Sequence, residues 1–119
     1  ITAGGENVTP SLIEVELKRS PLIGDAVVIG DERPYLTVLI SPDTEAAAQA
    51  GLDAAGVHAA VEAAIEKVNL GLGRVRQIKR FTILQQPLSI ERGELTPTAK
   101  VKRKVVREHF AAEIEAMYE

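Results

Sequence analysis

Two short aliphatic runs separated by a polar loop constrain the fold more than any other feature of this chain. They occupy residues 26–29 and 36–40, and both are rich in the β-branched residues that favour strands. Residues 30–34 between them, Gly-Asp-Glu-Arg-Pro, have the composition of a turn. The pattern predicts two antiparallel strands. Because each run is apolar almost without interruption, both faces of the sheet are expected to be covered.

A helix is predicted just before these strands. Thr9 followed by Pro10 is typical of a helix start, with Thr9 as the N-cap and Pro10 at the first helical position. The helix is expected to run to about residue 19. Glu14 and Lys18 are one turn apart, so they are expected to pair on its solvent side.

The rest of the chain alternates between helical and extended patterns. Helices are predicted from residues 43–49 and from about 57–70, followed by a third strand over 77–84. Residues 89–99 read as a polar loop, and 101–118 as one terminal helix. This order predicts an α+β fold, with a small antiparallel sheet of about three strands packed with helices.

Composition excludes several classes of protein. The 119 residues fit a single domain, and the absence of cysteine excludes a disulfide framework and a thiolate metal site. No apolar run approaches the roughly 18 residues of a membrane span, so a soluble chain is expected. The first residue is Ile1 and not Met, which leads us to expect a domain excised from a longer protein.

Charge is unevenly distributed along the chain. Residues 74–107 hold ten basic residues against two acidic ones, a net +8, whereas the whole chain carries −3 and the remainder therefore −11. This pattern favours a local anion site over general binding to polyanions, and a solvated charged surface is the simpler alternative.

The start of the predicted terminal helix departs from the usual charge preference. Lys100, Lys102, Arg103 and Lys104 lie where the helix dipole disfavours cations by roughly 0.3–1 kcal/mol each. Such a cluster suits a phosphate or carboxylate ligand, although the side chains can also extend outward into solvent.

Other candidate sites are weaker. His58 and His109 lack the spacing of a metal site or a catalytic pair, so no metal is expected to bind this chain. Gly4 and Gly5 precede a helix without forming a known phosphate-binding fingerprint.

Two motifs together resemble a known family. Residues 1–10 read Ile-Thr-Ala-Gly-Gly-Glu-Asn-Val-Thr-Pro and residues 93–103 read Gly-Glu-Leu-Thr-Pro-Thr-Ala-Lys-Val-Lys-Arg, with Gln-Ile-Lys-Arg-Phe at 77–81 between them. The chain resembles, over its whole length, the C-terminal domain of adenylate-forming acyl-CoA synthetases. The branch it resembles is that of the AMP-forming long-chain fatty acid:CoA ligases.

The resemblance implies a two-step reaction in a larger enzyme. Fatty acid and ATP form an acyl-adenylate and pyrophosphate, and coenzyme A then displaces AMP to give the thioester. Residues 1–119 would be the mobile C-terminal lid, whose partner is an N-terminal domain of the same polypeptide. That domain, absent here, would bind ATP, Mg²⁺ and the acyl chain, so the isolated fragment is expected to be inactive.

The resemblance also implies roles for individual residues. Lys100 matches the catalytic lysine of adenylation, whose ammonium bridges the carboxylate and the α-phosphate. The loop of Gly4, Gly5, Glu6 and Asn7 matches the segment that faces coenzyme A and the adenylate in the second step. Possible phosphate contacts are Arg103, Arg74, Arg76 and Lys79.

One departure from the family pattern lies beside the lysine. Many short-chain members carry Ser-Gly immediately before it, whereas Thr98 and Ala99 precede Lys100 here. The Thr-Pro-Thr form resembles the long-chain branch.

Two alternatives remain open at this point. The chain could be a non-catalytic module that uses residues 74–107 to bind nucleic acid or an acidic partner. It could also serve a related enzyme that passes the adenylate to another acceptor. The ligase interpretation predicts no nucleic-acid binding, a cytoplasmic location, and at most peripheral contact with the inner face of the membrane.

Overall fold

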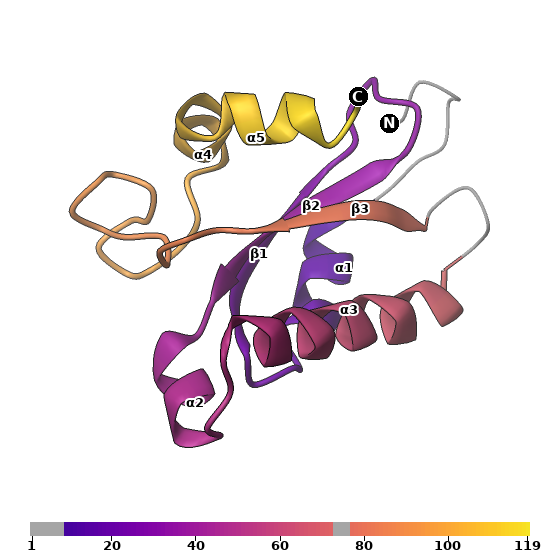
Figure 1. Cartoon of the computed structure of the whole chain (residues 1–119). Helices are drawn as coiled ribbons and strands as arrows, with labels where there is room; N and C mark the ends of the chain where they lie inside the picture. The colour runs from indigo at the N-terminus through magenta and orange to yellow at the C-terminus, as the bar shows by residue number, and fades with distance from the viewer. Residues whose placement is uncertain (1–8, 73–76) are drawn as a thin grey trace.

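The computed structural model, which describes residues 9–72 and 77–119, contains a three-stranded sheet covered by helices on both faces (Figure 1). The α+β class predicted from the sequence is confirmed. In chain order the elements are α1 (Pro10–Leu17), β1 (Ile23–Ile29), β2 (Leu36–Pro42), α2 (Thr44–Gln49), α3 (Ala54–Leu70), β3 (Ile78–Ile83), α4 (Arg103–His109) and α5 (Ala111–Ala116).

The sheet is mixed, which corrects the prediction of an antiparallel sheet. β1 and β2 pair antiparallel as expected, with Val28 opposite Val38. β3, however, runs parallel to β2, with Phe81 opposite Val38. The reason is the connection between them. α2 and α3 form a long crossover that returns the chain to the starting end of β2, as a parallel pair requires.

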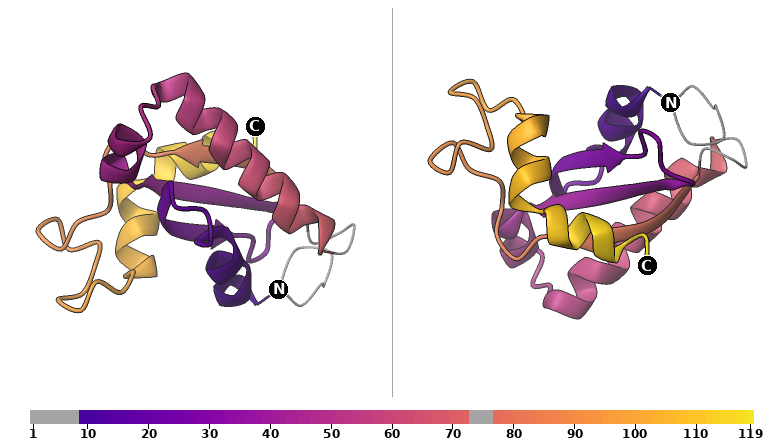
Figure 2. Two further views of the ribbon diagram at one scale, coloured as in Figure 1. Left: turned by 90° about the horizontal axis from the view of Figure 1, so that it is seen from below. Right: turned by 90° about the horizontal axis from the view of Figure 1, so that it is seen from above.

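Side chains alternate along the strands and build two separate cores. Val28, Val38 and Ile40 pack in one core with residues of α1 and α3, including Val61. Val27, Ile29 and Leu39 point the opposite way and pack with residues of α4 and α5. Figure 2 shows the two layers of helix on opposite sides of the strands. The expectation that both faces are covered is confirmed, and it explains why all seven residues of β2 are buried.

Aspartate caps set the starts of the middle helices. Asp43 accepts the N–H of Ala46 at 2.9 Å and begins α2, as predicted. Asp53 accepts the N–H of Gly56 at 2.8 Å, so α3 begins at Ala54, three residues earlier than its apolar stripe indicated.

The predicted terminal helix is divided in two. Phe110 has φ −114° and ψ 27°, which ends α4 and allows α5 to begin at a new angle. The C-terminal end of α5 is fastened to the sheet by Tyr118. Its hydroxyl accepts a hydrogen bond from Thr37 at 3.1 Å and lies 2.9 Å from the carbonyl oxygen of Tyr35.

Within residues 9–72 and 77–119, no helix combines the length and the apolarity needed to cross a bilayer. α3, at 17 residues, is the longest of the described helices.

Candidate functional site

Lys100 lies in a tight hairpin that protrudes between β3 and α4. Leu95 and Val101 form an isolated antiparallel bridge at its base. The N–H of Thr96 donates to the carbonyl of Lys100 at 2.7 Å, and the N–H of Ala99 donates to the carbonyl of Thr96 at 2.8 Å. These two bonds define a three-residue loop in which Pro97, with its fixed φ, occupies the position that favours proline.

Ala99 adopts a conformation that normally belongs to glycine. Its φ is +63°, in the left-handed region, where a Cβ atom costs roughly 1–2 kcal/mol. The three-residue hairpin requires this conformation at its last loop position. Ala99 occupies the position where many short-chain members of the resembled family carry glycine. It is therefore the residue of this turn whose backbone conformation glycine would adopt without strain.

A buried carboxylate organises the segment that carries this hairpin. Glu94 is only 1% exposed. Its Oε1 accepts the N–H of Ser89 at 3.1 Å and Nε of Arg92 at 3.2 Å. Its Oε2 lies 2.9 Å from Nδ1 of His109 on α4. The carboxylate thus joins the start of the loop to the helix that follows the hairpin.

The backbone of Glu94 holds the same two sides together. Its N–H donates to the carbonyl of Ser89 at 3.1 Å, and its carbonyl accepts the N–H of Lys102 at 2.8 Å. Lys102 directly follows the Leu95–Val101 bridge. Glu94 is therefore fixed through both its side chain and its backbone, immediately beside the base of the Lys100 hairpin.

The environment of Glu94 favours its ionised form. Burial is the largest single influence and by itself would raise the pKa of this carboxyl group. The hydrogen bonds from His109, Arg92 and the Ser89 N–H, together with the charge of Arg92, outweigh it and hold the pKa of Glu94 below its ordinary value. The group is therefore a buried anion with its partners in place.

The loop is also anchored to the sheet. Leu88 is buried in the core below α4 and α5, and its N–H donates to the hydroxyl of Ser41 at 3.0 Å. Arg92 in turn donates to the carbonyl of Pro87 at 2.6 Å. The segment thus has fixed points at the end of β2 and at Glu94.

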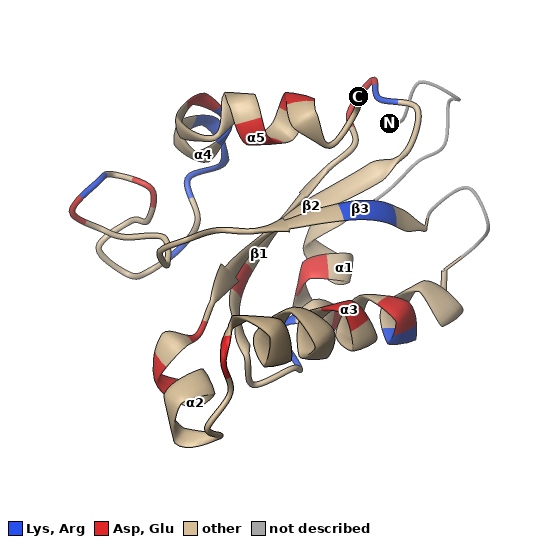
Figure 3. Cartoon of the chain, in the orientation of Figure 1, with Lys and Arg blue, Asp and Glu red and all other residues tan. Residues whose placement is uncertain are grey.

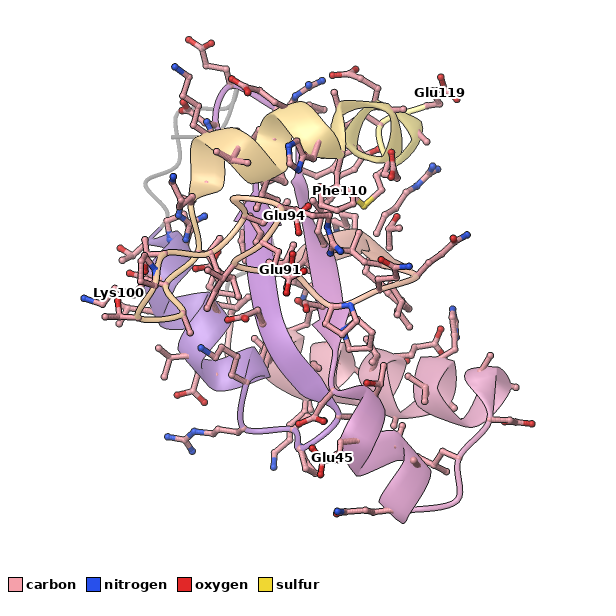
Figure 4. The ribbon with its side chains drawn as sticks, turned by 90° about the vertical axis from the view of Figure 1, so that its left-hand side faces the viewer. Glu45, Glu91, Glu94, Lys100, Phe110 and Glu119 are labelled. Atoms are coloured by element: carbon pink, nitrogen blue, oxygen red, sulfur yellow. The ribbon has the colours of Figure 1, made fainter. Side chains whose placement is uncertain are left out.

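The side chain of Lys100 itself is exposed and points away from the domain (Figure 4). No carboxylate of the described residues lies within ion-pairing distance of its ammonium. The hairpin loop therefore presents one cation on a hydrogen-bonded turn, where it can meet an anionic group outside this part of the chain.

Arg103, by contrast, is engaged within the domain. Its guanidinium forms an ion pair with Glu14 of α1. The second oxygen of Glu14 accepts the N–H of Val28 at 2.7 Å. The predicted pair between Glu14 and Lys18 is wrong, because Glu14 turns inward and Lys18 instead lies 3.4 Å from Asp25.

Of the other predicted basic residues, Lys79 lies within the described part of the chain. Lys79 is exposed on β3, and Figure 3 shows that the start of β3 and the hairpin region lie at opposite ends of the molecule. Gly4, Gly5, Glu6 and Asn7 of the expected coenzyme A loop, and Arg74 and Arg76, lie outside the described residues.

The described residues contain no group of three or more His, Asp or Glu side chains placed to hold a metal ion. The arrangement can supply a positioned positive charge.

Sequence reasoning missed Glu94 and treated His109 as isolated. They are 15 residues apart, and only the fold of the intervening hairpin brings them together. A glutamate in a loop carries no periodic signal that marks it as buried. Its one local hint is its position directly before the Leu95–Val101 pair.

Comparisons with known proteins decide the family. A family model described as the AMP-binding enzyme C-terminal domain matches residues 1–119. The chain belongs to this family. The long-chain-fatty-acid–CoA ligase FadD15 of Mycobacterium tuberculosis is 42% identical to this AMP-binding C-terminal domain over 132 residues, covering 99% of the chain. The human long-chain-fatty-acid–CoA ligase ACSBG1 is 34% identical and covers all of it.

The domain spans only about a fifth of these relatives, 22% of FadD15 and 21% of ACSBG1. Solved structures agree on the fold. The adenylation domain of a carboxylate reductase from Mycobacterium chelonae superposes with a TM-score of 0.82 and 28% identity, covering 98% of this chain and 19% of that one. An adenylation and carrier-protein didomain of a carboxylic acid reductase from Segniliparus rugosus, in complex with AMP, gives 0.80 and 31%, covering 98% and 17%.

The positive φ of Ala99 generates a stability prediction. Ala99→Gly relieves the contact of the Cβ with the backbone, so it is expected to raise the free energy of unfolding by about 0.5–1 kcal/mol. Gly51→Ala is the matched reverse change, because Gly51 has φ +70° with no atom near its Cβ position, and it should lower that energy by a similar amount. Urea titration measures both. If Ala99→Gly lowers the free energy of unfolding, the backbone of Ala99 is not strained at this turn.

The lowered pKa of Glu94 generates a pH prediction. A carboxyl group whose pKa is depressed by folding stabilises the protein above its unfolded pKa of about 4.5, and this contribution is lost as pH falls through the folded pKa. The native chain should therefore lose free energy of unfolding between pH 5 and pH 3 more steeply than Glu94→Gln. Glu91→Gln, which changes an exposed glutamate of the same loop, should keep the native slope. Parallel slopes for the native chain and Glu94→Gln would exclude the buried anion.

Proposed function

We propose that this domain is the mobile lid of an AMP-forming long-chain fatty acid:CoA ligase, and that Lys100 is its catalytic residue in adenylation. The observation that carries the proposal is the presentation of Lys100. Its side chain is exposed and has no carboxylate partner among the described residues. It lies on a hairpin whose base is held by Glu94, which is hydrogen-bonded to Lys102 and His109. Membership of the family supports the reaction class.

The chemistry asked of Lys100 is electrostatic. When a fatty carboxylate attacks the α-phosphate of ATP, two anionic groups are forced together and charge develops between them. An ammonium held at that point stabilises the transition state more than the separated reactants. The hairpin and the Glu94 network keep the ammonium in place before reaction, so less reorganisation is needed when the charge develops.

The remaining groups of the reaction would be bound elsewhere. ATP, Mg²⁺ and the acyl chain are expected in an N-terminal domain of the same polypeptide, which is the partner of this lid. Mg²⁺ would be held there as well, since no group of three or more His, Asp or Glu side chains among residues 9–72 and 77–119 is placed to hold a metal ion. Cytoplasmic location and peripheral membrane contact stay predictions.

Coenzyme A would act in the second step. The loop of Gly4, Gly5, Glu6 and Asn7 is proposed to face it, and Lys79, Arg74 and Arg76 are candidate contacts for its phosphates. The phosphate contact that the family resemblance implies for Arg103 would have to compete with its ion pair to Glu14.

The alternative of a nucleic-acid or acidic-partner module is less well supported. Within the described part of residues 74–107, Arg92 is paired with Glu94 and Arg103 with Glu14. Arg80 donates to the backbone of Glu119 at 2.8 Å. These engagements account for three of the described basic residues, and the start of β3 lies at the opposite end of the molecule from the hairpin.

A second candidate changes only the acceptor. The solved structures with high TM-scores are adenylation domains of carboxylic acid reductases, one of them joined to a carrier protein. This likeness favours a role for the lid in an enzyme that passes the adenylate to a carrier thiol. The greater identity to FadD15 favours coenzyme A. Formation of acyl-CoA from fatty acid, ATP and coenzyme A distinguishes the two acceptors.

The role of Lys100 gives a direct prediction. In the intact protein, Lys100→Ala should lower fatty-acid-dependent ATP–pyrophosphate exchange by about 10²–10³-fold, the loss typical of removing one oxyanion donor. Thioester formation from supplied acyl-adenylate should change less than about threefold, because the lysine is not needed there.

Lys104→Ala is the matched control, since Lys104 is an exposed lysine on α4, four residues further along. It should leave both activities near their native values. Unchanged exchange in Lys100→Ala would remove this lysine from the mechanism, and equal losses in both variants would reduce its role to general surface charge.

A further inference from the structure

We propose that Arg103 is a positioning residue that seats the Lys100 hairpin on α1 through Glu14, and that it is not a phosphate ligand. The proposal rests on the proposed function for its catalytic readout. Its structural part concerns only described residues and can be tested separately.

The geometry places Glu14 at a junction of three elements. It projects from α1, and its side chain is 12% exposed. One carboxylate oxygen forms an ion pair with the guanidinium of Arg103 at the start of α4. The other accepts a hydrogen bond from the N–H of Val28 on β1. β1 is an edge strand, so this N–H would otherwise lack a partner. Glu14 is thus held in place by the sheet while it binds Arg103.

Arg103 is the point at which this junction reaches the hairpin. It lies three residues after Lys100 and directly follows Lys102, whose N–H is bonded to Glu94. The two consecutive residues that follow the hairpin, Lys102 and Arg103, are therefore each bonded to a different part of the domain. Glu94 holds Lys102 to the loop and α4 side, and Glu14 holds Arg103 to α1 and β1.

The surroundings of Arg103 differ from those expected of a ligand contact. Its side chain is 35% exposed and its charge is already neutralised by Glu14. To reach a phosphate it would have to leave behind a largely buried carboxylate without its cation. Lys100, three residues earlier, is exposed and has no carboxylate partner among the described residues. Of Lys100 and Arg103, Lys100 is therefore the cation that is available to an external anion.

The test compares Arg103→Gln, Glu14→Gln and the double variant in the intact protein. Glu115→Gln is the matched control, because it breaks the Arg33–Glu115 ion pair, another long-range contact that does not involve the hairpin. Hydrogen exchange is measured at the amides of Thr96, Ala99 and Lys102, whose bonds define the hairpin. ATP–pyrophosphate exchange supplies kcat and the KM for ATP, and thioester formation supplies the KM for coenzyme A.

The positioning role predicts a specific pattern. Each single variant should exchange at these three amides about tenfold faster and lose about tenfold in adenylation kcat, since small displacements of a reacting group are costly. The double variant should be no worse than either single, because both remove one interaction. Both KM values should stay within about twofold, and Glu115→Gln should match the native protein. Arg103→Lys, which keeps the charge, should restore part of the loss.

Other outcomes overturn the proposal. If Arg103→Gln raises the KM for ATP or coenzyme A and leaves the three amides protected, Arg103 is a phosphate ligand. If the two single losses multiply in the double variant, Glu14 and Arg103 act independently. Unaltered amide exchange rejects the seating role even where Lys100→Ala abolishes adenylation. Faster amide exchange with unchanged adenylation in both Arg103→Gln and Lys100→Ala rejects the proposed function and leaves the seating of the hairpin intact.

Discussion

The buried carboxylate of Glu94 is the interaction on which the geometry of the Lys100 hairpin depends. An anion in the interior is tolerated only when its partners satisfy it, and Glu94 has three, on Ser89, Arg92 and His109. These partners belong to the loop before the hairpin and to the helix after it. The same requirement that keeps the carboxylate satisfied therefore also fixes the two ends of the hairpin relative to each other.

The layered fold explains why Lys100 lies at the end of the sheet and is exposed to solvent. Helices cover both faces of the sheet, and every residue of β2 is buried. The segment between β3 and α4 leaves the layers at the end of the sheet, where a side chain can reach another molecule. Leu88 and Ser41 tie it to β2, and Glu14 and Arg103 tie its far end to α1. The lysine is exposed, yet its backbone is held on several sides.

The sequence predicted the elements better than their partners. The strands and the cap at Asp43 were predictable because their signals are local. The parallel pairing of β3 was not, since it depends on where a crossover returns the chain. Glu14 had an obvious neighbour in Lys18, yet its partner is Arg103, 89 residues away. Lys100 could be proposed because its motif carries a family resemblance, whereas the burial of Glu94 arises only from the folded hairpin.

The most direct test of this account is a double-mutant cycle between Glu94→Gln and Lys100→Ala, measured as kcat for ATP–pyrophosphate exchange in the intact protein. If Glu94 acts by positioning the lysine, Glu94→Gln should slow adenylation about tenfold when Lys100 is present and should have no further effect once Lys100 is alanine. Losses that multiply in the double variant would show that Glu94 acts independently of Lys100, and would contradict the account.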